Sequence, residues 1–188
     1  WGCRASTGTG FGSVLSGPTL SDGSGWGTPE HYGTIRMGDL DGDGKQDLCA
    51  RGNAGMFCWK STGSGFGGQI VGPALSDAAG FNNIKYWSTI RLADVNGDGK
   101  ADLCVRTSTD FRCYLSNGNG FGGAVTKAIM TDATGWGDID NYSTIRLGDI
   151  DGDGDLDLCA RSNSVMVCWP WTRSGFGAQI NGPALSDA

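Results

Sequence analysis

Residues 39–51 read DLDGDGKQDLCAR, and two close variants of this stretch follow: DVNGDGKADLCVR at 94–106 and DIDGDGDLDLCAR at 149–161. The three copies begin 55 residues apart. A second marker, Gly-Phe-Gly, recurs with the same spacing around Phe11, Phe66, Phe121 and Phe176. Because an unvarying period means that the loops have fixed lengths, we expect repeated units of one shape that pack against their neighbours.

The period divides the chain into one partial and three complete units. Residues 24–78 form unit 1, residues 79–133 form unit 2 and residues 134–188 form unit 3. Residues 1–23 correspond to residues 166–188, so they represent the second half of a further unit.

Within unit 1 the side chains follow the pattern of short β-strands. Residues 34–38 alternate apolar and polar side chains with a period of two. Two further strands at 48–51 and 56–60 surround a turn at 52–55, and a fourth strand lies near 69–71. Four short antiparallel strands are the content of a β-propeller blade. The sequence therefore predicts an all-β fold of propeller-type blades, present as an incomplete or open array.

Each acidic stretch places oxygen-bearing side chains at its first, third, fifth and ninth positions. With the backbone carbonyl of the seventh residue, these oxygens suit a hard cation such as Ca²⁺. Glycines at positions four and six permit the tight turn that brings the ligands together. We predict three calcium sites, formed by Asp39, Asp41, Asp43, Lys45 and Asp47, by Asp94, Asn96, Asp98, Lys100 and Asp102, and by Asp149, Asp151, Asp153, Asp155 and Asp157.

Two other interpretations of the acidic stretches were weighed. An EF-hand requires a bidentate Glu at position 12, where this chain has Ala50, Val105 and Ala160. An Asp-Gly turn without an ion would leave the carboxylates to repel one another, in three copies in register. Three Ca²⁺ ions would also offset the formal charge of −6. Calcium is therefore the favoured interpretation.

Seven cysteines in a small glycine-rich chain are typical of an oxidising, extracellular location. Six of them form pairs nine residues apart, and a hairpin centred on residues 53–54 places the two members of the first pair opposite each other. We predict three cross-strand disulfides rather than free thiols or zinc sites, since zinc favours closer cysteine spacing and histidine. The predicted pairs are Cys49 with Cys58, Cys104 with Cys113 and Cys159 with Cys168, and Cys3 is left over.

The strand, the motif Asp-x-(Asp/Asn)-Gly-Asp-Gly-x-x-Asp-Leu, the hairpin and Gly-Phe-Gly together resemble the FG-GAP/VCBS repeat family, which includes the propeller of integrin α-chains. The resemblance covers the whole chain, unit by unit. The order Gly25-Trp26, His31, Arg36 and Asp39 is also similar to fungal seven-bladed propeller lectins. This resemblance implies calcium-stabilised propellers used for recognition or adhesion, or as accessory modules of secreted proteins.

The chain departs from that family in its number of units. A closed propeller of this type takes about seven blades, so the chain is either a piece of a larger propeller or a window on a fibre of stacked repeats. Because the first residues do not resemble a signal peptide, we expect a mature or excised segment. The expected partners are other copies or further repeats of the same chain, including an upstream strand that pairs with Cys3.

Several recurring aromatic residues could stack on sugar rings, although packing between blades is the favoured interpretation. Glycans are therefore a further expected partner. The candidate ligand-binding residues are Trp26, Trp136, Tyr32, Trp87 and Tyr142. Asn141-Tyr142-Ser143 is an N-glycosylation sequon, with Asn141 as the acceptor.

Composition argues against several classes of function. A formal charge of −6 is unsuited to nucleic acid, and no apolar run is long enough to cross a bilayer. A single histidine and acids largely committed to the repeated loops argue against an enzyme. We expect a non-catalytic extracellular calcium-binding scaffold with a structural or adhesive role. The alternative is a carbohydrate-binding module or an accessory domain.

Overall fold

The computed structural model describes residues 2–185, with the side chains of all of these except Thr126 and Lys127. It contains one two-stranded sheet at the N-terminus and three four-stranded antiparallel sheets. The first sheet pairs β1 (Gly2–Ser6) with β2 (Phe11–Ser16). The larger sheets contain β3 (Arg36–Gly38), β4 (Asp47–Gly52), β5 (Gly55–Ser61) and β6 (Phe66–Val71); β7 (Arg91–Ala93), β8 (Asp102–Arg106), β9 (Asp110–Ser116) and β10 (Phe121–Ile129); and β11 (Arg146–Gly148), β12 (Asp157–Arg161), β13 (Val165–Trp169) and β16 (Ile180–Ala184).

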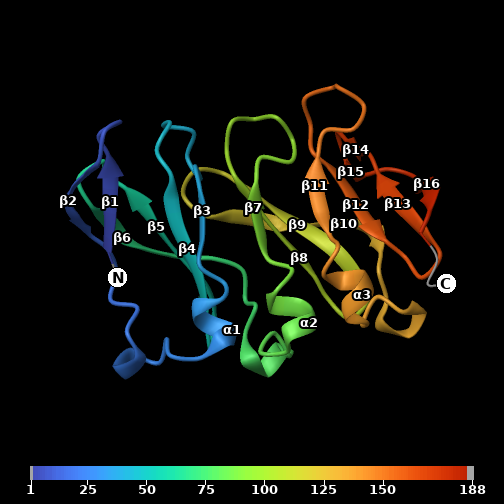
Figure 1. The fold of residues 1–188 in the computed structure, drawn as a ribbon, viewed down its shortest axis with the longest axis horizontal. Helices are drawn as coiled ribbons and strands as arrows, with labels where there is room; N and C mark the ends of the chain where they lie inside the picture. The colour runs from blue at the N-terminus through green and yellow to red at the C-terminus, as the bar shows by residue number, and fades with distance from the viewer. Residues whose placement is uncertain (1, 186–188) are drawn as a thin grey trace.

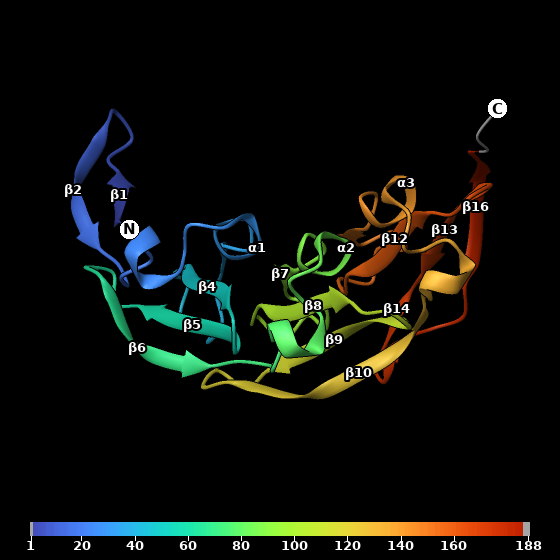
Figure 2. The same cartoon turned by 90° about the horizontal axis from the view of Figure 1, so that it is seen from below.

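The sheets stand side by side in chain order, and each lies within one of the predicted units (Figure 1). The connections between β3 and β4, β7 and β8, and β11 and β12 all lie at the same end of the molecule, at the top of Figure 1. Viewed from below, the row of sheets curves into an open arc, with β6 and β10 on its convex side (Figure 2). The predicted all-β, blade-like and unclosed architecture is confirmed.

Register between the two central strands of each sheet follows the prediction. Cys49 lies opposite Cys58 and Arg51 opposite Met56, around a two-residue turn at Asn53-Ala54. The same alignment recurs in the other two units, and all three predicted cross-strand disulfides are present, with Cα–Cα distances of 4.0–4.1 Å. Cys3 is a free thiol.

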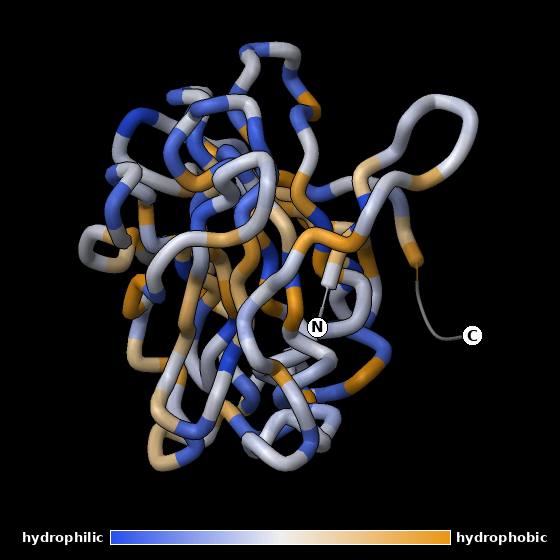
Figure 3. Tube along the Cα trace, turned by 90° about the vertical axis from the view of Figure 1, so that its left-hand side faces the viewer, coloured by the Kyte–Doolittle hydropathy of each residue, from blue (hydrophilic) through white to orange (hydrophobic). Residues whose placement is uncertain are grey.

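Hydrophobic side chains are buried between neighbouring sheets, because a single thin sheet cannot cover its own apolar faces. Met56 and Leu75 of unit 1 share a cluster with Leu103 and Val105 of unit 2. An equivalent cluster joins units 2 and 3. Figure 3 shows hydrophobic segments in the middle of the molecule and hydrophilic loops toward its ends.

Polar contacts across each junction reinforce the apolar packing. Arg36 donates from Nε to the carbonyl of Ile90 at 3.0 Å, and Arg91 donates from Nη2 to the carbonyl of Ile145 at 3.5 Å. Burial lowers the pKa of Arg91 to about 10, with a smaller effect from the neighbouring arginines. Units 1 and 2 thus each donate an arginine hydrogen bond to a carbonyl of the next unit.

Two features of the fold were not predicted from the sequence. Short helices precede the first strand of each unit: α1 (Pro29–Tyr32), α2 (Ile84–Trp87) and α3 (Ile139–Tyr142), and each follows a 3₁₀ turn, at Asp22–Ser24, Asp77–Ala79 and Asp132–Thr134. In unit 3 a further small sheet, β14 (Trp171–Thr172) with β15 (Gly175–Phe176), packs Phe176 against Phe111 of unit 2. No helix among residues 2–185 is long and apolar enough to span a membrane.

A buried arginine follows the second strand's cysteine in units 1 and 2. Arg51 and Arg106 are fully buried and pair with Asp77 at 2.7 Å and Asp132 at 2.8 Å. Asp132 also accepts hydrogen bonds from Lys85 and Tyr86, each at 2.7 Å. Burial by itself would raise the pKa of Asp132, but these partners lower it below its usual value.

Asp132→Asn should lower the free energy of unfolding by about 2–4 kcal/mol, because it leaves the guanidinium of Arg106 buried without a counter-charge. Asp22 occupies the same repeat position on the exposed surface. Asp22→Asn, the matched control, should change stability by less than about 0.5 kcal/mol. Urea unfolding of the two variants checks the difference, and equal effects would contradict it.

Candidate functional site

The first acidic loop brings three carboxylates together between β3 and β4. One oxygen from each of Asp39, Asp41 and Asp43 lies within 4.8 Å of the others. Oδ1 of Asp41 is buried and has no hydrogen-bond partner. An orphaned carboxylate oxygen beside two further carboxylates is chemically suited to a hard divalent cation.

Asp39 also shapes the loop from within. Its Oδ1 accepts the N–H of Gly42 at 2.8 Å, and its Oδ2 accepts the N–H of Gly44 at 2.7 Å. Gly42 and Gly44 have φ angles of 75° and 84°, a conformation that side chains other than glycine rarely adopt. The alternating Asp-Gly pattern therefore encodes a turn that points the acidic side chains inward.

The ninth position has a different role from the first three. Asp47 is buried, and its two oxygens accept the N–H groups of Leu40 at 2.9 Å and Ser61 at 2.7 Å. The structure does not place Asp47 in the carboxylate group of the loop. Asp47 ties the loop to β5, and its role as a ligand stays a prediction.

The second loop repeats this geometry with one amide. Asp94 accepts the N–H groups of Asp98 and Gly99, and Asn96 stands where unit 1 has Asp41. Asp102 is fully buried and accepts the N–H groups of Val95 and Ser116. An amide oxygen is also a calcium ligand, so this loop retains a suitable donor set.

The third loop is the most acidic. Asp149, Asp151 and Asp153 form the second close carboxylate group among the described residues. Asp155 replaces the lysine found at this position in the other loops, and its pKa is raised, by desolvation and then by repulsion from nearby aspartates. Asp157 takes the buried ninth position. This loop has the least internal compensation for its negative charge.

Lysines compensate the charge of the first two loops. Lys45 pairs with Asp43 at 2.5 Å, and this hydrogen bond is the main reason that the pKa of Asp43 is lowered. Lys100 lies 3.5 Å from Asp98. The expected contribution of Lys45 and Lys100 to metal binding is a backbone carbonyl, and that contribution stays a prediction.

Consecutive loops are in contact with one another. The N–H of Ala101 donates to the carbonyl of Asp39 at 2.6 Å, and the N–H of Leu156 donates to the carbonyl of Val95 at 3.2 Å. The loops therefore form a continuous acidic row along one end of the arc. Because consecutive loops share a backbone hydrogen bond, a conformational change in one loop can displace the next.

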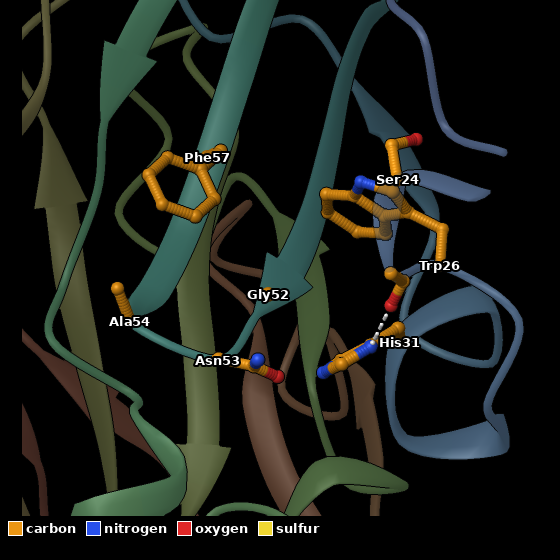
Figure 4. Close-up of a pocket in the computed structure, with 8 residues that line it drawn as sticks. Ser24, Trp26, His31, Gly52, Asn53, Ala54 and Phe57 are labelled. Carbon is orange, nitrogen blue, oxygen red and sulfur yellow. Dashed lines mark hydrogen bonds between the residues drawn. The ribbon is translucent and has the colours of Figure 1, made fainter. Parts of the chain in front are cut away.

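A cavity of about 260 Å³ lies at the opposite end of unit 1 (Figure 4). Trp26 and His31 form one side, and Asn53 and Ala54, at the tip of the β4–β5 hairpin, form the other. Trp26 is half-buried and meets the imidazole ring edge-on, with the ring centroids 5.8 Å apart. Phe57 completes the apolar part of the lining.

The His31 side chain is held in a fixed orientation. The residue is only 6% exposed, and its Nδ1 lies 2.6 Å from the carbonyl oxygen of Gly25. Its other ring nitrogen, Nε2, is buried without a hydrogen-bond partner and is turned toward the hairpin side of the cavity (Figure 4). Unpartnered buried polar atoms are uncommon and call for an explanation.

The predicted ligand-binding aromatics fall into two groups. Trp26 lines the cavity and Tyr32 is 54% exposed. Trp136 and Tyr142 are only 7% and 6% exposed within the cluster that joins units 2 and 3, and Trp87 packs against the cluster between units 1 and 2. Trp136 and Tyr142 are packing residues, in agreement with the interpretation favoured from the sequence. Ligand contact of the other aromatic residues stays a prediction.

The asparagine of the possible glycosylation sequon is buried in the folded chain. Asn141 is 2% exposed, and its side-chain nitrogen donates to the carbonyl of Gly135 at 2.9 Å and to Oδ1 of Asn163. A glycan on this nitrogen would have to displace both bonds and open the core. The sequon match does not detect this burial.

Comparison with known proteins agrees with the repeat and its geometry. The sequence model of the FG-GAP-like repeat matches residues 39–105 and again residues 94–160, which together exceed half of the chain. The chain belongs to the FG-GAP-like repeat family. No curated protein matches it in sequence.

Among the solved structures that share the fold of this FG-GAP-like chain, two illustrate the likeness. The first is an Agrocybe aegerita lectin described as recognising non-reducing terminal N-acetylglucosamine, with a TM-score of 0.80 and 22% identity over 96% of this chain. The second is a Tc holotoxin pore of Photorhabdus luminescens, with a TM-score of 0.61 and 22% identity over 92% of this chain. The chain spans 45% of the lectin chain and 8% of the toxin chain, and at this identity the likeness concerns the fold alone.

Burial raises the pKa of Asp102 to about 6. Unfolded aspartate has a pKa near 3.9, so the folded state binds the proton more tightly and, without metal, becomes more stable as the pH falls from about 7 to 5. A carboxyl NMR titration in chelator should show a midpoint near pH 6 for Asp102, and Asp102→Asn should weaken the pH dependence of unfolding. A midpoint near 4 would contradict this expectation.

Proposed function

We propose that this chain is a non-catalytic, extracellular scaffold in which each unit is stabilised by one calcium ion. The main support is the pair of close carboxylate groups, one of which contains the orphaned oxygen of Asp41. The amide-containing second loop has the same backbone arrangement. Three disulfides indicate an extracellular or secreted protein, where calcium is abundant and thiols are oxidised.

In this proposal the first, third and fifth residues of each loop hold the ion, with the carbonyl of the seventh. The ion neutralises carboxylates that otherwise repel one another and fixes the connection between the first two strands of each unit. Since neighbouring loops touch, ordering one loop also supports the next. The expected role is structural or adhesive, with other copies or further repeats as partners.

Calcium should bind with a stoichiometry of three per chain, measured by isothermal titration calorimetry. At a free concentration one hundred times the dissociation constant, each site should add about 2.7 kcal/mol to the free energy of unfolding. Asp153→Ala, which deletes one carboxylate of the third loop, should remove one site, whereas Asp138→Asn, which alters an exposed aspartate outside the loops, should leave three. Unfolding midpoints that are identical in calcium and in chelator would refute the proposal.

A second function, carbohydrate binding, is favoured by the cavity beside Trp26. Indole faces stack on the apolar C–H faces of sugars, while nearby polar groups bind the hydroxyls. The cavity combines such a face with the free Nε2 of His31 and the exposed amide of Asn53. The lectin neighbour supports this function only through its fold.

Carbohydrate binding can be tested on a glycan array and then by calorimetry with methyl glycosides of glucose, galactose and N-acetylglucosamine. Asn53→Ala should weaken binding about tenfold through the lost hydrogen bonds. The matched control is Ser108→Ala, at the same exposed position of the hairpin in unit 2, and should bind like the unmodified chain. If no glycan binds the calcium-loaded chain, this second function is wrong.

A further inference from the structure

The repeat places different residues at one position of its three units: His31 and Asn141, which are buried, and Tyr86, which is partly buried. Each lies in a short helix, and the rings of His31 and Tyr86 meet those of Trp26 and Phe81. A unit can bind a ligand at this position only if the polar side-chain atom has no hydrogen-bond partner within the protein.

In unit 2 the polar atom is satisfied within the protein. The hydroxyl of Tyr86 donates to Oδ2 of Asp132 at 2.7 Å. The guanidinium of Arg106 lies 5.1 Å from the centre of the Tyr86 ring, which holds the ring in place. Tyr86 therefore offers no unmet hydrogen-bonding group to a ligand.

In unit 3 a neighbouring side chain occupies the corresponding space. The side-chain nitrogen of Asn141 donates to both Gly135 and Asn163. A Cβ added to Gly135 would come within 2.8 Å of the Asn163 amide, whereas a Cβ added to the equivalent Gly25 of unit 1 would meet nothing within 4 Å. The Asn163 side chain thus closes in unit 3 the space that remains open in unit 1.

In unit 1 the hydrogen bond on one side of the imidazole determines the chemistry of the other side. A carbonyl oxygen can only accept, so the 2.6 Å contact with Gly25 requires the proton on Nδ1 of His31. In the neutral ring Nε2 is then a lone-pair acceptor, buried and without a partner. A ligand group that reaches Nε2 must therefore be a hydrogen-bond donor.

We propose that unit 1 holds the single ligand site of this type in units 1–3, and that a hydroxyl or N–H group of the ligand donates to Nε2 of His31. The inference rests on the proposed carbohydrate-binding function and specifies its stoichiometry and the required ligand group. A carboxylate or ether oxygen next to Nε2 would be disfavoured, because the lone pairs of the oxygen and of Nε2 would repel each other. The cavity volume of about 260 Å³ suits one small ring, and a larger cleft of about 430 Å³ shares Trp26 and Phe57 and extends the site.

The first test reads the imidazole directly. His31 is the only histidine in the chain, so its two nitrogens give the only imidazole signals in a ¹⁵N NMR spectrum. At about pH 8 the spectrum should show a protonated Nδ1 and an unprotonated Nε2, and saturating methyl glycoside should shift the Nε2 signal more than the Nδ1 signal. A proton on Nε2 in the free protein would overturn the inference.

The second test pairs ligand and protein changes. Calorimetry should give one site per chain, and one monodeoxy analogue of the bound methyl glycoside should bind about tenfold more weakly to the native chain. His31→Phe keeps a ring beside Trp26 and lacks Nε2. This variant should bind the analogue and the unmodified methyl glycoside with equal affinity. Sugar binding that is unaffected by His31→Phe would overturn this inference and leave carbohydrate binding intact.

The third test changes unit 1 to the residue found in unit 3. His31→Asn places an amide next to Asn53, which is the repeat equivalent of Asn163. The introduced amide can donate to Asn53 as Asn141 donates to Asn163, so the variant should bind no sugar, and unreduced binding would overturn the inference. Asn163→Ala, which changes unit 3 alone, is the control and should stay at one site. Two sites in the native chain would overturn the inference, and absence of all sugar binding would remove the carbohydrate function on which it rests.

Discussion

The fold depends on a buried aspartate at the end of each acidic loop. Asp47, Asp102 and Asp157 each accept two backbone N–H groups. One comes from the start of the loop, and the other comes from the third strand in units 1 and 2 and from β14 in unit 3. Because a buried carboxylate is costly unless it is well bonded, these contacts fix the loop and the hairpin in one relative position. The cysteine two residues after each aspartate and the arginine four residues after it are therefore held in place by the same contacts.

Much of this architecture could be predicted, because a constant repeat period implies units of the same length and shape. The fixed period set the units, and the symmetry about Asn53-Ala54 placed Cys49 opposite Cys58. The helices were missed because four residues such as Pro29–Tyr32 are too short for an apolar period to show. The local signals were the N-cap Asn83 and a proline, Pro29, at the first position of α1.

The site was harder to predict than the fold, since it depends on where the repeat is broken. Trp26 and Trp136 are the same residue type at the same repeat position, yet one lines an open cavity and the other is buried in a core. Val95, Cys104 and Phe111 of unit 2 cover Trp136, whereas among the described residues the sheet before unit 1 contains β1 and β2 alone. Asn163 beside Gly135 adds to the difference. A pattern of residue types does not contain that information, whereas the lone histidine at position 31 marks the unit that differs.

The cross-strand disulfides also govern how the chain would respond to a pulling force. Each one joins the second and third strands of a unit nine residues apart, with Cα atoms about 4 Å from each other. Tension along the backbone passes through the sulfur bridge and bypasses the hairpin tip, so roughly 30 Å of contour length per unit cannot be released while the bond is intact. An extracellular array of such units would yield in short steps and keep its hairpins folded under load.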